Sequence, residues 1–430
     1  MKHSLKFALA GGIVLAAAGC QFLSRNPPMA SPSEAKFPLP GLVDLAYAQG
    51  AGGGPLRLFM IHGIHSHPVG WAETSYLDNF VADPKAKEHG WVVSICTPAR
   101  PVRWMEPEAT SDNPSPPNQV EYPAVNFCGQ LQAYQIVDAG GKTCVVAYEL
   151  TWSPLTDPFK AWRFKGGNGS GFNDETQYRP AVNQEIRDVI DENLSDAVLY
   201  ARGFDGNIIG KTTSHALEMF YTGALDPDQG DAAASKRRSA PTAFLTESLG
   251  SIILAEAMTA HVKDHHFTGK KRSGMHDVLR NLKSVYMMAN QIALLDMPVP
   301  DPSGNVIPSA QADEAALNAR SGEKHGVFRS FIDSRKTLLA EPSDPVPAAA
   351  PGAASARAST LLVAAFSDLY DDLSYRVSTD SLPESDAKVD NFYPRNAPNI
   401  LGILENPDTA HTTYGSSPDV VRVVMEGYSP

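Results

Sequence analysis

The sequence predicts an α/β protein in which helices cover both faces of a mostly parallel sheet. From Leu56 onward, short apolar runs rich in β-branched residues alternate with longer segments of helical periodicity. The chain has 430 residues, 43% of them hydrophobic, which is enough to bury a large core. Its formal net charge of -12 offers a nucleic acid no electrostatic attraction. A globular protein with no nucleic-acid partner is therefore expected.

The first residues differ from the rest of the chain. A basic start at Lys2, His3 and Lys6 precedes an apolar run that is too short to span a bilayer comfortably and that ends at Cys20. This pattern is typical of an export signal. The ending "LAAAGC" resembles the lipobox of bacterial lipoproteins. The resemblance implies that Cys20 is lipidated, becomes the new N-terminus and anchors the exported protein in the cell envelope.

This interpretation divides the chain into three parts. Residues 1–20 are the lipoprotein-type signal, although an ordinary cleavable signal with a chance cysteine remains the alternative. Residues 21–54 begin with a Pro- and Ser-rich stretch and are expected to form a tether. Residues 55–430 are expected to form the folded domain.

The first half of that domain contains the following predicted elements. They are a strand at 56–63, a helix at 76–90, a strand at 91–98, a hairpin of 131–138 and 143–153 around a Gly-rich turn, and helices at 178–203 and 207–223.

The second half begins with a polar loop at 223–241. It continues with a strand at 242–248, a helix from Leu249 or Gly250, a strand at 282–295, helical patches at 312–320 and 326–339, strands at 359–368 and 396–405, and a closing helix from Pro418. We interpret Pro298–Arg357 as an insertion that covers a site like a lid, because long elaborations between core strands are usually functional or disordered.

The cysteines allow one internal disulfide. Without Cys20, the remaining Cys96, Cys128 and Cys144 are an odd number for an oxidising compartment. Cys128 and Cys144 are the nearer pair, but the turn between them places them out of cross-strand register, so the pairing stays open. No cysteine spacing resembles a metal site.

The segment "TESLG" joins a predicted strand to a predicted helix. Ser248 has small residues two positions away on each side, Thr246 and Gly250. A nucleophile elbow needs this pattern, because a sharp turn places the serine in strained geometry and only small neighbours let strand and helix pass closely. A helix-capping serine is the alternative.

A nucleophilic serine needs a base and a group that orients the base. His411, in "DTAHTTYG", follows the last predicted strand, where an imidazole can reach the carboxyl ends of the strands. The acid is expected after the preceding strand, where Asp371 is favoured and Asp368 is held in reserve.

An oxyanion hole is expected after the first strong strand, which ends in His62 and Gly63. Glycine allows the next backbone N–H to point at a developing oxyanion, and the expected donors are the N–H groups of Ile64 and Leu249. With the elbow, the acid and the base in this order, the chain from Leu56 to Tyr428 resembles the α/β-hydrolase superfamily of lipases and esterases.

The resemblance implies a serine esterase or lipase that needs no cofactor and acts through an acyl-enzyme on hydrophobic or lipid-like esters. The chain length of the substrate, and the preference for ester or amide, stay open. The alternative is a non-catalytic envelope lipoprotein that keeps the fold for binding or scaffolding. A metal site is not expected, because neither the cluster of His62, His65 and His67 nor the pair His261 and His265 has a carboxylate partner in a recognisable motif.

Overall fold

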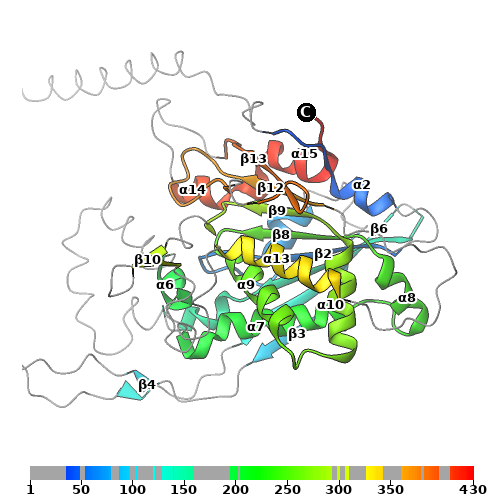
Figure 1. Ribbon diagram of the computed structural model, residues 1–430, viewed down its shortest axis with the longest axis horizontal. Coiled ribbons are helices and arrows are strands. Elements are labelled where there is room, and N and C mark those ends of the chain that lie inside the picture. The colour runs from blue at the N-terminus through cyan, green and yellow to red at the C-terminus, as the bar shows by residue number, and fades with distance from the viewer. Residues whose placement is uncertain are drawn as a thin grey trace, which may run out of the picture.

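The computed structural model in Figure 1 describes most of the chain from residue 35 to its end. The described residues are 35–48, 54–78, 87–96, 103–104, 120–121, 128–138, 140–158, 160, 194–201, 204–292, 298–300, 306–308, 326–341, 360–378, 382–396 and 407–430.

The centre of the protein is an eight-stranded sheet with the strand order β13-β12-β9-β8-β2-β7-β6-β3. Neighbouring strands run parallel from β13 to β7, whereas β6 is antiparallel to both β7 and β3. The expectation of an α/β protein with a mostly parallel sheet is confirmed. In chain order the strands are β2 (Leu56–Ile61), β3 (Lys87–Cys96), β6 (Cys128–Val137), β7 (Thr143–Thr151), β8 (Thr242–Glu247), β9 (Leu282–Met288), β12 (Leu361–Phe366) and β13 (Ala387–Phe392).

Helices cover both faces of this sheet, as strand β2 shows most clearly. Its residues are all buried. Leu58 and Met60 belong to one hydrophobic cluster, and Phe59 and Ile61 belong to the other. A strand that is covered on both sides reads as a continuous apolar run, which is why this segment was recognisable from sequence.

The larger hydrophobic cluster lies under one layer of helices, which are grouped together in Figure 1. These are α7 (Phe204–Thr222), α9 (Gly250–Lys263), α10 (Gly269–Asn281) and α13 (Val327–Ala340). The smaller cluster lies under α2 (Leu42–Tyr47) and α15 (Pro418–Glu426).

Shorter elements complete the described fold. The short helices are η2 (Glu73–Leu77), η4 (Ser153–Leu155), α6 (Ser195–Ala201), α8 (Asp231–Ser239), α14 (Pro407–Thr412) and η8 (Tyr414–Ser416). The paired short strands are β1 (Leu39–Pro40) with β14 (Gly427–Tyr428), β4 (Arg103–Trp104) with β5 (Val120–Glu121), and β10 (Pro298–Pro300) with β11 (Val306–Pro308).

The topology brings several loops to one edge of the sheet. From β2 the chain runs to the far edge, returns through β6 and β7, and then crosses to β8 on the other side of β2. The strand order therefore reverses beside β2, and open α/β sheets bind ligands at the carboxyl ends of strands near such a point. The segments after β2, β8 and β12 meet there.

Part of the expected tether is folded against the domain. The backbone N–H groups of Lys36 and Phe37 donate to the carboxylate of Asp390, at 2.7 and 3.0 Å. Strand β1 pairs with β14, and α2 packs against α15. The prediction that 21–54 is a tether is therefore wrong for residues 35–48, because apolar residues there add to the core beneath the C-terminal helix.

The structure settles the open question about the cysteines. Cys96 and Cys128 face each other across the antiparallel pair β3 and β6 and form a disulfide, and Cys144 is free. The turn after β6 places Cys144 beside Ile136, whose carbonyl oxygen accepts a hydrogen bond from its Sγ at 3.2 Å. The pairing of Cys128 with Cys144 is excluded by this register.

Several predicted boundaries are wrong. The expected insertion 298–357 contains α13, which packs on α9 as part of the core. The apolar face of this helix is buried there, although the sequence around the helix is irregular. The expected polar loop at 223–241 contains α8, and the helix expected up to Gly90 gives way to β3 from Lys87.

The last strand of the sheet is β13, which sequence reasoning missed because "AKVDNF" mixes polar and apolar residues. Most of the strand expected at 396–405 and most of the helix expected at 178–203 lie outside the described residues, as does Cys20. Within the described residues, no helix is both long enough and apolar enough to cross a membrane.

Candidate active site

Ser248 lies on a tight turn between β8 and α9. Its backbone φ angle is +51°, a left-handed conformation that costs a non-glycine residue on the order of 1–3 kcal/mol. The turn is held in place because the Ser248 N–H donates to the carbonyl oxygen of Met288 at 2.8 Å. A strained serine at the carboxyl end of a central strand is the geometry that a nucleophile elbow requires.

Small residues surround this turn, as the sequence pattern predicts. A Cβ atom added to Gly250 would lie 2.6 Å from the carbonyl oxygen of His62. A Cβ atom added to Gly63 would lie 2.2 Å from Cβ of Ser248. On the other side of the turn, the hydroxyl of Thr246 is hydrogen-bonded to that of Ser251 at 2.7 Å. The loop after β2 therefore touches the serine directly.

Ser248, His411 and Asp371 form one chain of hydrogen bonds. Nε2 of His411 is 2.9 Å from Oγ of Ser248, and its Nδ1 is 2.9 Å from each carboxylate oxygen of Asp371. Because a carboxylate accepts, Nδ1 carries the proton and Nε2 faces the serine as an acceptor. All three residues are buried. The arrangement is that of a serine with a base and an orienting acid.

Asp368 has a different set of partners. Its carboxylate accepts the backbone N–H groups of Tyr370 at 2.9 Å and Asn396 at 2.6 Å. Burial raises the pKa of Asp368. The geometry therefore places Asp371, and not Asp368, against His411.

Tyr414 is part of the acid's environment, and sequence reasoning missed it. Its hydroxyl donates to Oδ2 of Asp371 at 3.0 Å and accepts the backbone N–H of Asp368 at 2.7 Å. The N–H of Leu373 donates to the other oxygen of Asp371 at 3.0 Å. The carboxylate is thereby fixed in orientation from both sides. The sequence indicated that Tyr414 lies near the site only through its position, three residues after His411.

The backbone N–H groups of Ile64 and Leu249 lie on the two loops that meet at Ser248. Neither group donates to an acceptor among the described residues. Leu249 follows the serine directly. Ile64 follows Gly63, where an added Cβ atom would lie 2.9 Å from Oγ of Ser248. Both N–H groups are therefore available next to the serine oxygen.

His62 holds the peptide that carries the Ile64 N–H. Its Nδ1 donates to the carbonyl oxygen of Gly63 at 2.8 Å, and its Nε2 accepts the N–H groups of Trp152 and Ser153 at 2.9 and 3.3 Å. Burial lowers the pKa of His62 well below its usual range, so the ring stays neutral in this role. The carbonyl of Gly63 and the N–H of Ile64 belong to one planar peptide, and fixing one end fixes the other.

Within the described residues, no group of His, Cys, Asp and Glu side chains could hold a metal ion. His67 donates from Nε2 to the carbonyl oxygen of Ile64 at 3.2 Å, and burial lowers its pKa to about 3. His261 is stacked on Phe267, whereas His265 follows the end of α9 and is exposed. His261 and His265 therefore do not lie on the same helix.

Glu247, directly before the serine, is a further buried carboxyl group, and sequence reasoning did not identify it. Its Oε2 accepts a hydrogen bond from the hydroxyl of Tyr76 at 3.1 Å. Burial raises its pKa to about 7, and the nearby imidazole of His411 opposes the rise. The position of Glu247 in strand β8 does not reveal its partner, because the residue pattern of a strand does not show which side chains pack against it.

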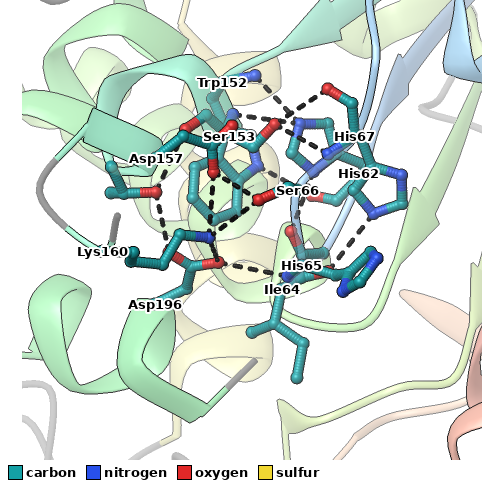
Figure 2. Close-up of polar contacts among 12 residues, drawn as sticks. His62, Ile64, His65, Ser66, His67, Trp152, Ser153, Asp157, Lys160 and Asp196 are labelled. Carbon is teal, nitrogen blue, oxygen red and sulfur yellow. Dashed lines mark hydrogen bonds and ion pairs between the residues drawn. The ribbon is translucent and has the colours of Figure 1, made fainter. Parts of the chain in front are cut away.

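A buried ion pair supports the loop after β2 (Figure 2). Nζ of Lys160 is 2.9 Å from Oδ2 of Asp196, and the same oxygen accepts the backbone N–H of His65 at 3.1 Å. The φ angle of His65 is +90°, which costs on the order of 1–3 kcal/mol, and a hydrogen bond to a charged group is worth about 1.5–3 kcal/mol. The hydrogen bond to Asp196 is therefore of the right size to offset the strain at His65. Sequence reasoning missed this cluster because its members come from separate segments.

Comparison of the chain with protein-family models, curated proteins and solved structures finds no match. The function is therefore inferred from the geometry of the site.

Proposed function

We propose that the protein is a serine hydrolase that cleaves carboxylic esters through an acyl-enzyme. The observation that carries the proposal is the hydrogen-bonded chain from Ser248 through His411 to Asp371, which starts at a strained serine. A capping serine has no need of such a base. The mostly parallel sheet with Ser248 after a central strand supports placing the chain in the α/β-hydrolase superfamily.

In the proposed first half-reaction, Oγ of Ser248 attacks the carbonyl carbon of the ester while Nε2 of His411 takes the hydroxyl proton. The carbonyl oxygen becomes an oxyanion that accepts hydrogen bonds from the N–H groups of Ile64 and Leu249. The carbon–oxygen bond to the alcohol then breaks. The leaving oxygen receives the proton from His411, and the acyl group remains on Ser248.

Water completes the reaction in the same way. His411 takes a proton from the water molecule, whose oxygen attacks the acyl carbon. When the second tetrahedral intermediate collapses, Oγ of Ser248 leaves and recovers its proton from His411, and the carboxylic acid is released. Asp371 stabilises the imidazolium in both halves and holds the ring in the required tautomer.

We also propose that the substrate is hydrophobic or lipid-like and that the protein is exported and anchored by lipid at Cys20. The short apolar run that ends in "LAAAGC" supports the anchor. A membrane-anchored esterase meets apolar esters at the surface where it is held. Apart from the ester and water, the proposed reaction uses side-chain and backbone groups of this chain.

The test is hydrolysis of short p-nitrophenyl esters by the purified protein. Wild-type protein should turn the esters over, and Ser248→Ala and His411→Ala should lose this activity while unfolding at a similar urea concentration. His265→Ala, at an exposed histidine outside the site, is the matched control and should keep full activity. A folded wild-type protein that cleaves none of these esters would favour the alternative of a non-catalytic envelope lipoprotein.

A further inference from the structure

Ile64, the expected oxyanion donor, lies between two peptides that side chains hold in place. The Gly63–Ile64 peptide is held by His62. In the Ile64–His65 peptide, Nε2 of His67 donates to the carbonyl oxygen at 3.2 Å, and the N–H donates to Oδ2 of Asp196 at 3.1 Å. Figure 2 shows these side chains converging on the loop. With both peptide planes fixed, the backbone angles of Ile64 between them are fixed as well.

His65 is the weak point of this loop. Its φ angle of +90° is one that side-chain-bearing residues rarely adopt, so an unsupported loop would relax toward negative φ. Such a relaxation would turn the Ile64–His65 peptide and strain the adjoining Gly63–Ile64 peptide, so that His62 alone would then hold the N–H of Ile64 in place. The hydrogen bond from the His65 N–H to Asp196 opposes it, and a charged acceptor makes that bond strong enough to matter.

Asp196 is fixed by further contacts that come from outside the loop. It lies on α6 and is fully buried. Its Oδ1 accepts the hydroxyl of Thr156 at 2.7 Å, and its Oδ2 is paired with Nζ of Lys160 at 2.9 Å. Burial raises the pKa of Asp196, and the ammonium of Lys160 opposes that rise. Lys160 therefore supplies the charge that a buried carboxylate needs.

We propose that Asp196 is a positioning residue of the hydrolase. Its carboxylate, paired with Lys160, holds His65 in the conformation that directs the Ile64 N–H at the oxyanion. The inference rests on the proposed function. It adds to that function a support for the oxyanion hole that lies on a different helix and does not touch the substrate.

The test compares two double variants that both lack the ion pair. In Asp196→Asn/Lys160→Met, the amide oxygen still accepts the His65 N–H, and the amide nitrogen can donate to Oγ1 of Thr156. In Asp196→Leu/Lys160→Met, a side chain of similar size has no acceptor. The two variants differ at one side chain, so a difference in turnover reports the hydrogen bond to His65.

We expect the leucine variant to have a kcat about 100-fold below that of the asparagine variant, because misplacing a catalytic group by about 1 Å costs on this order. KM should differ by less than about 3-fold, since an oxyanion donor acts mainly in the transition state. Affinity for a boronic acid, which mimics the tetrahedral intermediate on the serine, should fall in step with kcat. If the leucine variant does not fold, Asp196→Ala/Lys160→Met carries the same expectation.

Equal kcat and equal boronic-acid affinity in the two folded double variants would overturn the inference. It would also be overturned if the leucine variant differed from the asparagine variant only in a lower midpoint of urea unfolding. Either result leaves the proposed function intact as long as the wild type hydrolyses esters. A wild type without Ser248-dependent hydrolysis would instead contradict the proposed function itself. His261→Gln, which alters another buried histidine stacked on an aromatic ring, is the control for core damage and should keep the wild-type kcat.

Discussion

Gly63→Ala should disable the site by steric contact alone. The added methyl carbon would lie 2.2 Å from Cβ of Ser248 and 2.7 Å from the carbonyl oxygen of Glu247. Ordinary contacts between carbon atoms lie at about 3.5–4.0 Å, so the two loops must separate by more than about 1 Å. Neither obstacle is the flexible end of a side chain, because one is the first side-chain atom of the serine and the other is backbone.

The expected size of the effect follows from that displacement. A shift of about 1 Å between catalytic groups lowers the rate by about 100-fold, which corresponds to about 3 kcal/mol of transition-state stabilisation. Overpacking a core contact also costs about 1–3 kcal/mol of folding free energy. The variant should therefore stay folded and lose most of its kcat/KM for a p-nitrophenyl ester.

The matched control is Gly140→Ala in the exposed turn between β6 and β7. There the nearest atom to an added Cβ is a side-chain oxygen of Asp138 at 3.2 Å, which can move. This variant should keep the wild-type kcat/KM. If Gly63→Ala matches the control in kcat/KM, the close approach of the loop to Ser248 does not contribute to catalysis.

Three further predictions concern the acid, the buried glutamate and the anchor. Asp371→Asn should lower kcat by more than about 1000-fold, because the base loses its orienting partner, whereas Asp368→Asn should lower it far less; a reversed order in steady-state kinetics would reassign the acid. Glu247→Gln should match the wild-type stability near pH 4. Because the pKa of Glu247 in the folded state is raised to about 7, the wild type loses stability as the pH rises from about 4.5 to 7. In urea unfolding at pH 8, the variant should therefore be more stable than the wild type by up to about 3 kcal/mol. Equal stability of the two proteins at both pH values would contradict this. Cys20→Ser should release the protein from membranes on fractionation, and an unchanged membrane fraction would argue against the lipid anchor.

Much of the fold was visible in the sequence because buried parallel strands are continuous apolar runs. The strands at Leu56, Thr242 and Leu361 were placed within a few residues of their observed bounds. Strand β13 was not predicted, because its polar residues have partners elsewhere in the chain. Asp390, for example, accepts hydrogen bonds from backbone N–H groups of the N-terminal segment. Such pairing across the whole chain leaves no local pattern.

The site shows the same division between local and long-range information. Local patterns identified Ser248 and the glycine-containing loop after β2, since strain and close approach restrict which residues fit there. The choice between Asp371 and Asp368 needed the structure, because both follow the same strand and only the course of the loop decides which carboxylate faces His411. The contact of Lys160 with Asp196 joins two segments that no periodicity relates.

The most direct test of whether Ser248 is an activated nucleophile is covalent labelling of the purified protein with a fluorophosphonate, followed by peptide mapping. An activated serine is phosphonylated, whereas an ordinary buried hydroxyl is not. We expect a single adduct on Ser248 in the wild type and no adduct in folded His411→Ala, in which the base is missing. An adduct on a different serine, or no adduct on a folded wild-type protein, would contradict it.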